Sequence, residues 1–364
     1  MVDVLPFLAR KGRGATLNPD GRFERYATQD VDDGWERAVE DTDNPSPKTN
    51  LHIDTSRSVI NAIDSPDLPY MRSINPYRGC ENGCIYCYAR PSHGYLGFSA
   101  GMDFETEIFH KPNAPELLRR ELAAKHYQPH PITLGSNTDC YQPVERGQKL
   151  TRRILQVLSD HHHAVTIITK SALVMRDIDL LVPMAAQGLA QVLVSVTTLD
   201  PELARAMEPR AAAPYRRLET IKALADAGIP VTVMAAPMIP ALNDMEMEKI
   251  LEAAWEAGAR SAHYTLVRLP HELKDLMRDW LHHHRPDRAE HVLSLIRDTR
   301  GGKLYDAAFG TRRSGTGPYA TLIADRFRLA VKRIGFNRDE RTLRTDLFRK
   351  PEPNGQMGFD FGGA

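Results

Sequence analysis

Residues 75–90 read NPYRGCENGCIYCYAR and contain three of the four cysteines of this 364-residue chain, Cys80, Cys84 and Cys87. Their spacing is C-x3-C-x2-C, and Gly79 and Gly83 directly precede the first two cysteines, as a tight loop requires. Such clustering is typical of metal or iron–sulfur ligation rather than of structural cysteines scattered through a core. The stretch therefore predicts a loop that wraps an ion or a cluster.

The number of thiols in the loop limits the kind of site. A structural zinc site usually takes four protein ligands in pairs, and the sequence has no second C-x2-C pair. A [4Fe–4S] cluster usually takes four thiolates, so three would leave one iron open to another ligand. The alternative is that Cys140 is the fourth ligand, either of a structural metal site in an interaction protein or of an electron-transfer cluster.

The composition indicates a globular protein without a general affinity for one sign of charge. The chain has 47 basic and 47 acidic residues, 42% apolar residues and 26% charged residues. A zero net charge argues against a uniformly basic nucleic-acid binder. No run approaches the roughly 18 apolar residues of a membrane span, and the N-terminus is a poor signal peptide. We expect a cytoplasmic protein whose thiols stay reduced.

From residue 71 onward, short apolar runs alternate with helical patterns. Strands are expected at 72–75, 132–134, 165–169, 192–196, 231–235 and 263–267, and helices at 114–127, 145–160, 173–187, 214–228, 244–257 and 271–299. Strand–helix alternation over six units predicts an α/β fold with a parallel sheet and right-handed crossovers. This pattern fits a partial (β/α)6 TIM-like barrel, and a doubly wound open sheet is the alternative that it leaves open.

Polar segments directly follow the expected strands. They are GSNTDCYQ (135–142), TKS (169–171), SVTTLD (195–200), APMIP (236–240) and VRLP (267–270), besides the cysteine loop itself. In barrel enzymes the carboxyl ends of the strands build the active site. The sequence therefore predicts one site, at that end of the barrel, which includes the cysteine loop.

Charge divides the chain into three predicted parts, residues 1–65, 66–300 and 301–364. The first is expected to be an irregular extension, and residues 1–70 hold 8 basic and 13 acidic residues. The second is the barrel. The third is a basic helical segment and tail, because residues 301–350 hold 12 basic and 5 acidic residues. Its helix at 324–336 is interpreted as a docking helix with a solvated basic face, and the alternative is a nucleic-acid surface.

With Tyr86 before its last cysteine, the loop resembles the radical S-adenosylmethionine (radical SAM) superfamily, whose signature is C-x3-C-x-aromatic-C. Residues 195–231, APMIPALND (236–244) and VRLP resemble the branch around spore photoproduct lyase and its uncharacterised relatives. The likeness spans about 70–335 of this chain.

The resemblance implies a cofactor, a reaction class and partners. Cys80, Cys84 and Cys87 would hold three irons of a [4Fe–4S] cluster, and the fourth would chelate S-adenosylmethionine. One electron, from an external flavodoxin- or ferredoxin-like donor, would split the sulfonium into methionine and a 5′-deoxyadenosyl radical that abstracts hydrogen from a substrate. The branch makes nucleic acid or another macromolecule a candidate substrate. No sequence feature identifies that substrate, the overall reaction or the oligomeric state.

The resemblance also implies a set of contacts to S-adenosylmethionine from the loop and the strand ends. These are Tyr86 in the loop, Ser136, Asn137 and Thr138 at the methionine amino end, Lys170 at the methionine carboxylate, Ser195 and Thr197 at the ribose, and Arg210 nearby. The residue types alone also fit a solvated strand-end lysine for Lys170 and an ordinary strand hydroxyl for Ser195.

Cys140 is a separate candidate catalytic residue. In spore photoproduct lyase a cysteine near the end of the second strand returns a hydrogen atom to the product radical. Here Cys140 follows Asp139, and alignment on the S/T-D step puts Ser136 where that cysteine would be. The offset argues against photoproduct repair, and a buried, inert cysteine is the alternative for Cys140.

Overall fold

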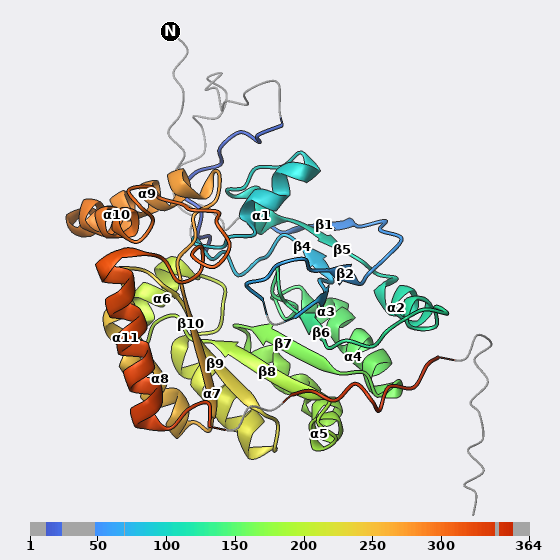
Figure 1. The fold of residues 1–364 in the computed structure, drawn as a ribbon. Helices are drawn as coiled ribbons and strands as arrows, with labels where there is room; N and C mark the ends of the chain where they lie inside the picture. Colours follow the sequence, from blue (N-terminus) through green and yellow to red (C-terminus); the bar gives the residue numbers. More distant parts are fainter. Residues whose placement is uncertain (1–11, 24–47, 69, 339–341, 352–364) are drawn as a thin grey trace, which may run out of the picture.

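The computed structural model describes residues 12–23, 48–68, 70–338 and 342–351 and has a seven-stranded sheet at its centre (Figure 1). In spatial order the strands of this sheet are β10 (Ser261–Leu266), β9 (Val231–Met238), β8 (Ala190–Ser195), β7 (Val165–Thr169), β6 (Ile132–Leu134), β3 (Arg72–Ile74) and β2 (Asn61–Ala62). The six strands from β3 to β10 are parallel, and only the edge strand β2 is antiparallel.

The strand order decides between the two folds that the sequence leaves open. From β3 to β10 each strand pairs with the strand of this sheet that follows it along the chain, so the order never reverses. A doubly wound sheet reverses its order at a switch point, whereas a barrel winds in one direction. Since β10 pairs only with β9 among the described strands, the barrel is partial, as predicted.

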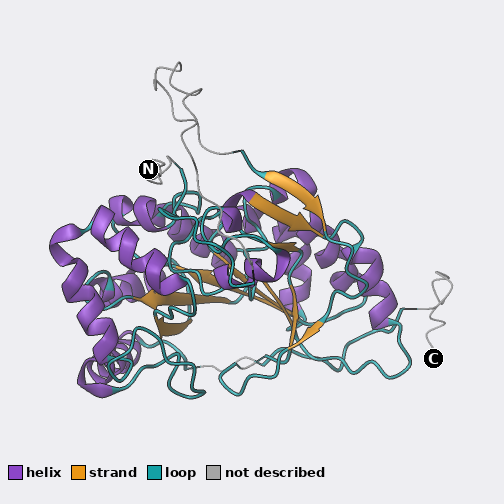
Figure 2. Cartoon of the chain, turned by 90° about the horizontal axis from the view of Figure 1, so that it is seen from above, coloured by secondary structure: helices purple, strands orange, loops and turns teal. Residues whose placement is uncertain are grey.

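Helices surround the sheet, and Figure 2 shows the strands in the middle of the molecule with helices around them. The helices are α2 (Ala114–Leu122), α3 (Glu145–Gln148), α4 (Leu150–Asp160), η3 (Ala172–Asp177), α5 (Ile178–Ala186), α6 (Pro201–Met207), α7 (Pro214–Asp226), η4 (Asp244–Glu246), α8 (Met247–Glu256), α9 (Leu273–His284), η5 (Pro286–Arg288), α10 (Ala289–Asp298) and α11 (Gly317–Ile334). Gly228 and Gly258 follow the ends of α7 and α8 at positive φ, as expected of C-terminal stops.

Two expected helices are interrupted. The one expected at 145–160 is divided by Lys149, whose φ is +50°. The one expected at 271–299 ends at His284 and resumes as α10 after Pro286, because proline excludes the residue before it from helical backbone geometry. Within the barrel, α6 is absent from the sequence prediction. It is short, and the Asp200 carboxylate caps it by accepting hydrogen bonds from two of its first amides.

A second, three-stranded sheet contains part of the segment expected to be irregular. β1 (Asn50–Ile53) pairs with β5 (Glu107–His110), and β5 also pairs with β4 (Tyr77–Arg78). The short helices η2 (Arg90–Leu96) and α1 (Asp103–Thr106) lie between β4 and β5 along the chain. The expectation for residues 1–65 therefore misses β1 and β2, while its acidic stretch at 30–43 lies outside the described residues.

The helix α11 packs against α8 beside the barrel (Figure 1). Its Arg326 pairs with Glu248 at 2.6 Å, and its Arg333 pairs with Glu252 at 2.6 Å. These pairs agree with a docking helix whose basic charge is partly neutralised. Within the described residues, no helix combines the length and the apolar character that crossing a membrane requires.

Candidate functional site

The cysteine loop follows β4 and forms one wall of a cavity of about 240 Å³. Cys80 and Cys84 are 6% and 8% exposed, Cys87 is partly exposed, and all three line the cavity. Gly79 and Gly83 have φ of +76° and +67°. The loop therefore turns tightly at both predicted glycines and brings the three cysteines to one surface.

The donor set suits a polynuclear cluster better than a single ion. In a cubane each thiolate binds a different iron, so the three side chains need not converge on one point. Among the described residues, no group of three or more His, Cys, Asp or Glu side chains is arranged to hold a metal ion. Burial raises the pKa of the Cys80 thiol, and of Cys84 despite the opposing charge of Lys170. Bound iron would offset this cost by stabilising thiolates.

Asp139 joins the cysteine loop to the ends of two strands. Its carboxylate accepts hydrogen bonds from Asn82 Nδ2 at 3.0 Å, Thr169 Oγ1 at 2.7 Å and the Lys170 amide at 2.8 Å. It also accepts one from the Tyr141 amide at 2.9 Å. Asn82 and Asp139 both line the cavity, and the sequence analysis did not select either as a site residue, although each lies in a segment that it quoted.

Glu81 supports the loop from the side away from the cavity. One carboxylate oxygen accepts from Thr49 Oγ1 at 2.6 Å and pairs with Arg210 Nη2 at 3.0 Å. The other accepts from the Val144 amide at 2.6 Å. Arg210 therefore contacts the loop through Glu81 and through its own amide, which donates to the backbone oxygen of Asn82 at 3.3 Å, and it does not line the cavity.

Residues 12–16 of the N-terminal segment pack beneath the same loop. The buried Glu105 carboxylate accepts the amides of Gly14 at 3.0 Å and Ala15 at 2.8 Å, and it pairs with the buried Arg90. A Cβ at Gly14 would lie 1.8 Å from the backbone oxygen of Gly83. This contact between residues distant in sequence had no detectable signal beyond the glycines of GRG (12–14).

Five of the residues implied to contact S-adenosylmethionine line the cavity with the cysteines: Tyr86, Ser136, Asn137, Lys170 and Ser195. The ammonium of Lys170 lies 5.8 Å from the centre of the Tyr86 ring. Asn75 holds the Ser136 segment, because its Oδ1 accepts the Asn137 amide at 3.0 Å. These groups and the thiols therefore face one space.

Thr138 and Thr197 point elsewhere. Thr138 Oγ1 donates to the backbone oxygen of Tyr77 at 2.8 Å. Thr197 Oγ1 donates to Glu208 at 2.7 Å and lies 3.2 Å from the Tyr86 hydroxyl. Glu208 is buried and pairs with Arg217. Neither threonine lines the cavity, so the structure gives both a supporting position behind it.

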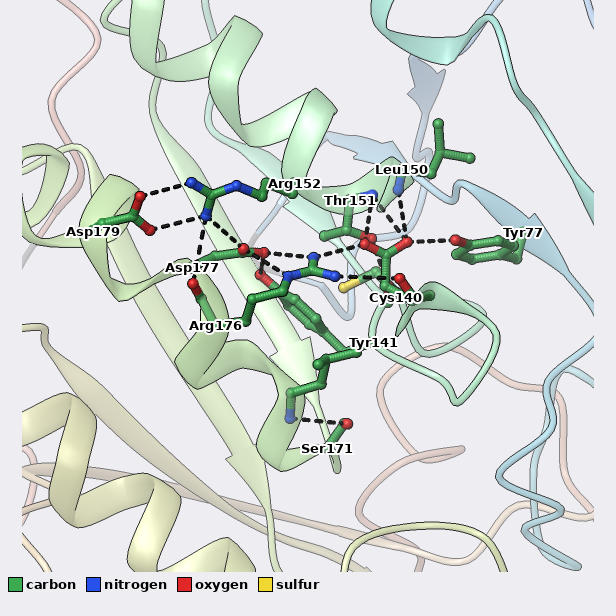
Figure 3. A network of polar contacts seen from close by, with 12 residues as sticks. Tyr77, Cys140, Tyr141, Leu150, Thr151, Arg152, Ser171, Arg176, Asp177 and Asp179 are labelled. Carbon is green, nitrogen blue, oxygen red and sulfur yellow. Dashed lines mark hydrogen bonds and ion pairs between the residues drawn. The ribbon is translucent and has the colours of Figure 1, made fainter. Parts of the chain in front are cut away.

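Cys140 lies behind the cavity in a buried polar network (Figure 3). Its side chain is fully buried and belongs to the core of the barrel, whereas the three loop cysteines lie in other apolar clusters. Around it, Glu145 accepts from Tyr77 and pairs with Arg176, and Asp177 pairs with Arg176 and Arg152. A catalytic role for Cys140 stays a prediction, and its burial favours the inert alternative.

A second wall of the cavity comes from the end of β10 and the loop before α11. It contributes Thr265, Leu266, Arg268, Arg312 and Arg313. Arg312 pairs with Asp67, and the Arg268 guanidinium lies 5.2 Å from the centre of the Tyr88 ring. Of these residues, only Arg268 lies in a polar segment that the sequence analysis placed at a strand end, VRLP.

Known proteins resemble this chain over its barrel. The family model of the radical SAM superfamily matches residues 74–254. An uncharacterised protein of Mycobacterium bovis is 34% identical over 250 residues, which cover 68% of this chain and 74% of the relative. An uncharacterised protein of Methanocaldococcus jannaschii is 31% identical over 191 residues, covering 52% of this chain and 68% of the relative.

Among solved structures, spore photoproduct lyase complexed with dinucleoside spore photoproduct has a TM-score of 0.56 to this chain, at 14% identity, with 78% of each chain covered. At this identity the likeness concerns the fold. The partial barrel, the three-cysteine loop and the family match together place this chain in the radical SAM superfamily, as an enzyme of that family.

Proposed function

We propose that Cys80, Cys84 and Cys87 hold a [4Fe–4S] cluster and that the cavity beside them binds S-adenosylmethionine. The observation that carries the proposal is that the three thiols share one cavity with Lys170, Ser136 and Ser195. When bound, the cluster and S-adenosylmethionine supply one-electron cleavage of the sulfonium and a 5′-deoxyadenosyl radical that abstracts hydrogen. The family membership supports this chemistry, and the substrate is unidentified.

Three side chains are assigned to S-adenosylmethionine in this proposal. Lys170 binds the methionine carboxylate as a point charge, and its backbone is held by the Asp139 carboxylate. Ser136 contacts the amino end, and the Asn75 amide donates to its hydroxyl at 3.3 Å. Ser195, at the end of β8, binds the ribose. Because the ends of rigid strands carry these groups, the groups need little rearrangement when S-adenosylmethionine binds.

The apolar lining of the cavity would keep water from the reacting atoms. Ile168, Met234 and Ala236 line it between the polar strand ends. Exclusion of water protects a reactive species from side reactions. The electron would come from an external donor, and the loop cysteine Cys87, the most exposed of the three, is the proposed approach point for it.

Anaerobic reconstitution with iron and sulfide tests this function. We expect a cluster whose EPR spectrum changes when S-adenosylmethionine is added, and formation of 5′-deoxyadenosine with a reductant. Zinc in place of iron, with no 5′-deoxyadenosine, would instead support the metal-stapled interaction protein. A reducible cluster whose spectrum ignores S-adenosylmethionine would support electron transfer with Cys140 as the fourth ligand. Deuterium transfer from labelled candidates into 5′-deoxyadenosine would then identify the substrate.

A further inference from the structure

The cavity wall formed by β10 and the loop before α11 lines the cavity with three arginines, Arg268, Arg312 and Arg313, and, among the described residues, with no carboxylate of its own. Arg268 and Arg313 both line the cavity, and neither forms an ion pair within the described part of the chain. The Nε of Arg268 is fully buried and has no hydrogen-bond partner there. Arg313 donates to the backbone oxygen of Asp67 at 2.6 Å.

Other cations surround these two guanidinium groups. Arg300 lies close enough to Arg268 for their like charges to lower the pKa of Arg300, after burial as the larger cause. Arg300 donates to the backbone oxygens of Val267 at 2.8 Å and Thr311 at 2.9 Å, so it holds the two segments together. The nearby carboxylate of Asp67 is paired with Arg312 and also lies close enough to Arg313 for their charges to interact, so one carboxylate serves two arginines.

Buried or half-buried cations without counter-charges are rare in proteins unless a ligand supplies the missing anion. A guanidinium presents a planar fork of donors that matches the oxygens of a phosphate. Two such forks on one wall, Arg268 and Arg313, suit a group with several charged oxygens. The aromatic rings of Tyr70 and Tyr88 also line this cavity and offer flat apolar surface beside the cations.

This wall is separate from the groups assigned to S-adenosylmethionine. The single carboxylate of that molecule is assigned to Lys170, which ends β7, whereas Arg268 follows β10 and Arg313 precedes α11. The arginines are therefore available to a second molecule in the same cavity. We propose that Arg268 and Arg313 bind a phosphate group of the substrate, an inference that rests on the proposed function because it takes this cavity as the place of hydrogen abstraction.

The test measures binding of phosphate probes to the reconstituted holoenzyme in the presence of S-adenosylmethionine. The probes are inorganic phosphate, glycerol 3-phosphate as a monoester and a fluorescein-labelled ten-nucleotide single-stranded DNA as a diester, with succinate as a carboxylate control. In R268Q and in R313Q we expect the Kd of the bound phosphate probe to rise about ten-fold. The matched control R328Q removes an exposed arginine of α11 outside the cavity and should leave binding unchanged.

The probes distinguish the sources of the phosphate. Binding of the monoester but not of the DNA points to a small phosphorylated substrate, and binding of the DNA alone points to a nucleic acid. Either result supports the phosphate site if it depends on Arg268 and Arg313. Failure of every phosphate probe to bind the wild-type enzyme, equal affinities in R268Q, R313Q and the wild type, or equal affinity for succinate would each overturn it.

A second pair of variants and one further measurement keep the result interpretable. If R268Q or R313Q fails to fold, R268K and R313K replace it. These variants keep the positive charge but lose the planar set of guanidinium donors, and we expect each to raise the Kd by a smaller factor. Formation of 5′-deoxyadenosine by the wild-type holoenzyme is measured in the same preparation. Its absence would refute the proposed function, whereas phosphate binding by the two arginines would still be tested.

Discussion

The two walls of the cavity differ in how their charged groups are compensated. Behind the cysteine loop, buried carboxylates have buried or half-buried arginine partners: Glu81 with Arg210, Glu105 with Arg90 and Glu208 with Arg217. On the β10 wall, Arg268 and Arg313 form no ion pair among the described residues, and Arg313 shares the charge of Asp67 with Arg312. Each of these carboxylates of the first wall therefore has its own arginine, whereas the second wall holds more arginines than carboxylates, as our proposal of a bound phosphate requires.

This contrast has a physical reason. A loop that presents three thiols must keep its shape before the cluster is inserted, and buried ion pairs with extra hydrogen bonds fix such a shape. A wall that selects a substrate gains affinity by leaving its donors unsatisfied until the substrate arrives. Substitutions behind the cysteine loop should consequently affect stability and iron binding, whereas substitutions on the β10 wall should affect ligand binding.

The largest effect is expected for Cys84→Ala. Loss of one thiolate ligand should reduce 5′-deoxyadenosine formation by more than about 100-fold. Mutation of a residue that only hydrogen-bonds a metal ligand already lowers metal affinity or activity by about 10–100-fold. Iron content per chain after anaerobic reconstitution should fall in parallel. Cys140→Ala is the matched cysteine control, and we expect it to retain iron, since Cys140 does not line the cavity. Equal iron loss in both variants would contradict our assignment of the ligands.

Gly14→Ala tests whether the N-terminal segment supports the first wall. The added Cβ would meet the backbone oxygen of Gly83, which cannot move without shifting the cysteine loop. We expect the free energy of unfolding, measured by chemical denaturation, to fall by about 1–3 kcal/mol. Iron uptake, measured during reconstitution, should become slower. Gly147→Ala is the control, because a Cβ there meets nothing within 4 Å. Identical behaviour of the two variants would show that the contact is unimportant.

Lys170→Met should weaken the binding of S-adenosylmethionine and leave the cluster intact. The substitution removes the point charge assigned to the methionine carboxylate but keeps a chain of similar length over the Tyr86 ring. We expect the Kd for S-adenosylmethionine to rise about ten-fold, with unchanged iron content. Lys222→Met, on the exposed face of α7, is the control. An unchanged Kd would mean that Lys170 is the strand-end lysine that its residue type alone also permits.

Much of the barrel could be predicted because its signals are local. The strands at 132–134 and 165–169 match β6 and β7 at both ends, since runs of β-branched residues with flanking turns mark buried parallel strands. The pairing of β1 with β5 and the packing of Gly14 against Gly83 could not be predicted, because the partners are distant in sequence. The break before Pro286 did have a local signal, the proline itself.

The site was predicted in part for a related reason. Side chains alternate between the two faces only while a strand continues, and β8 ends at Ser195. The alternation of side chains between the two faces therefore cannot be extended to Thr197, whose hydroxyl donates to Glu208 instead. Arg312 and Arg313 lie in an irregular loop 45 or more residues after the last strand, where no periodic pattern shows that the chain returns to the cavity.

The smallest effect is a titration on the β10 wall. His263 is an exposed residue of β10. Partial loss of hydration, and then the charge of Arg313, lower its pKa, so the folded state binds this proton slightly less readily than the unfolded state and loses a little stability as the pH falls below the ordinary histidine value. In R313Q the pKa of His263 should rise but stay below its ordinary value, because the loss of hydration is the larger cause. Histidine NMR signals would follow it, with R328Q as the control. Bound phosphate should also raise this pKa in the wild type, and a weaker response in R313Q would locate the anion beside Arg313. A pKa that neither the substitution nor phosphate changes would mean that Arg313 is screened by solvent and that the second wall is no less compensated than the first.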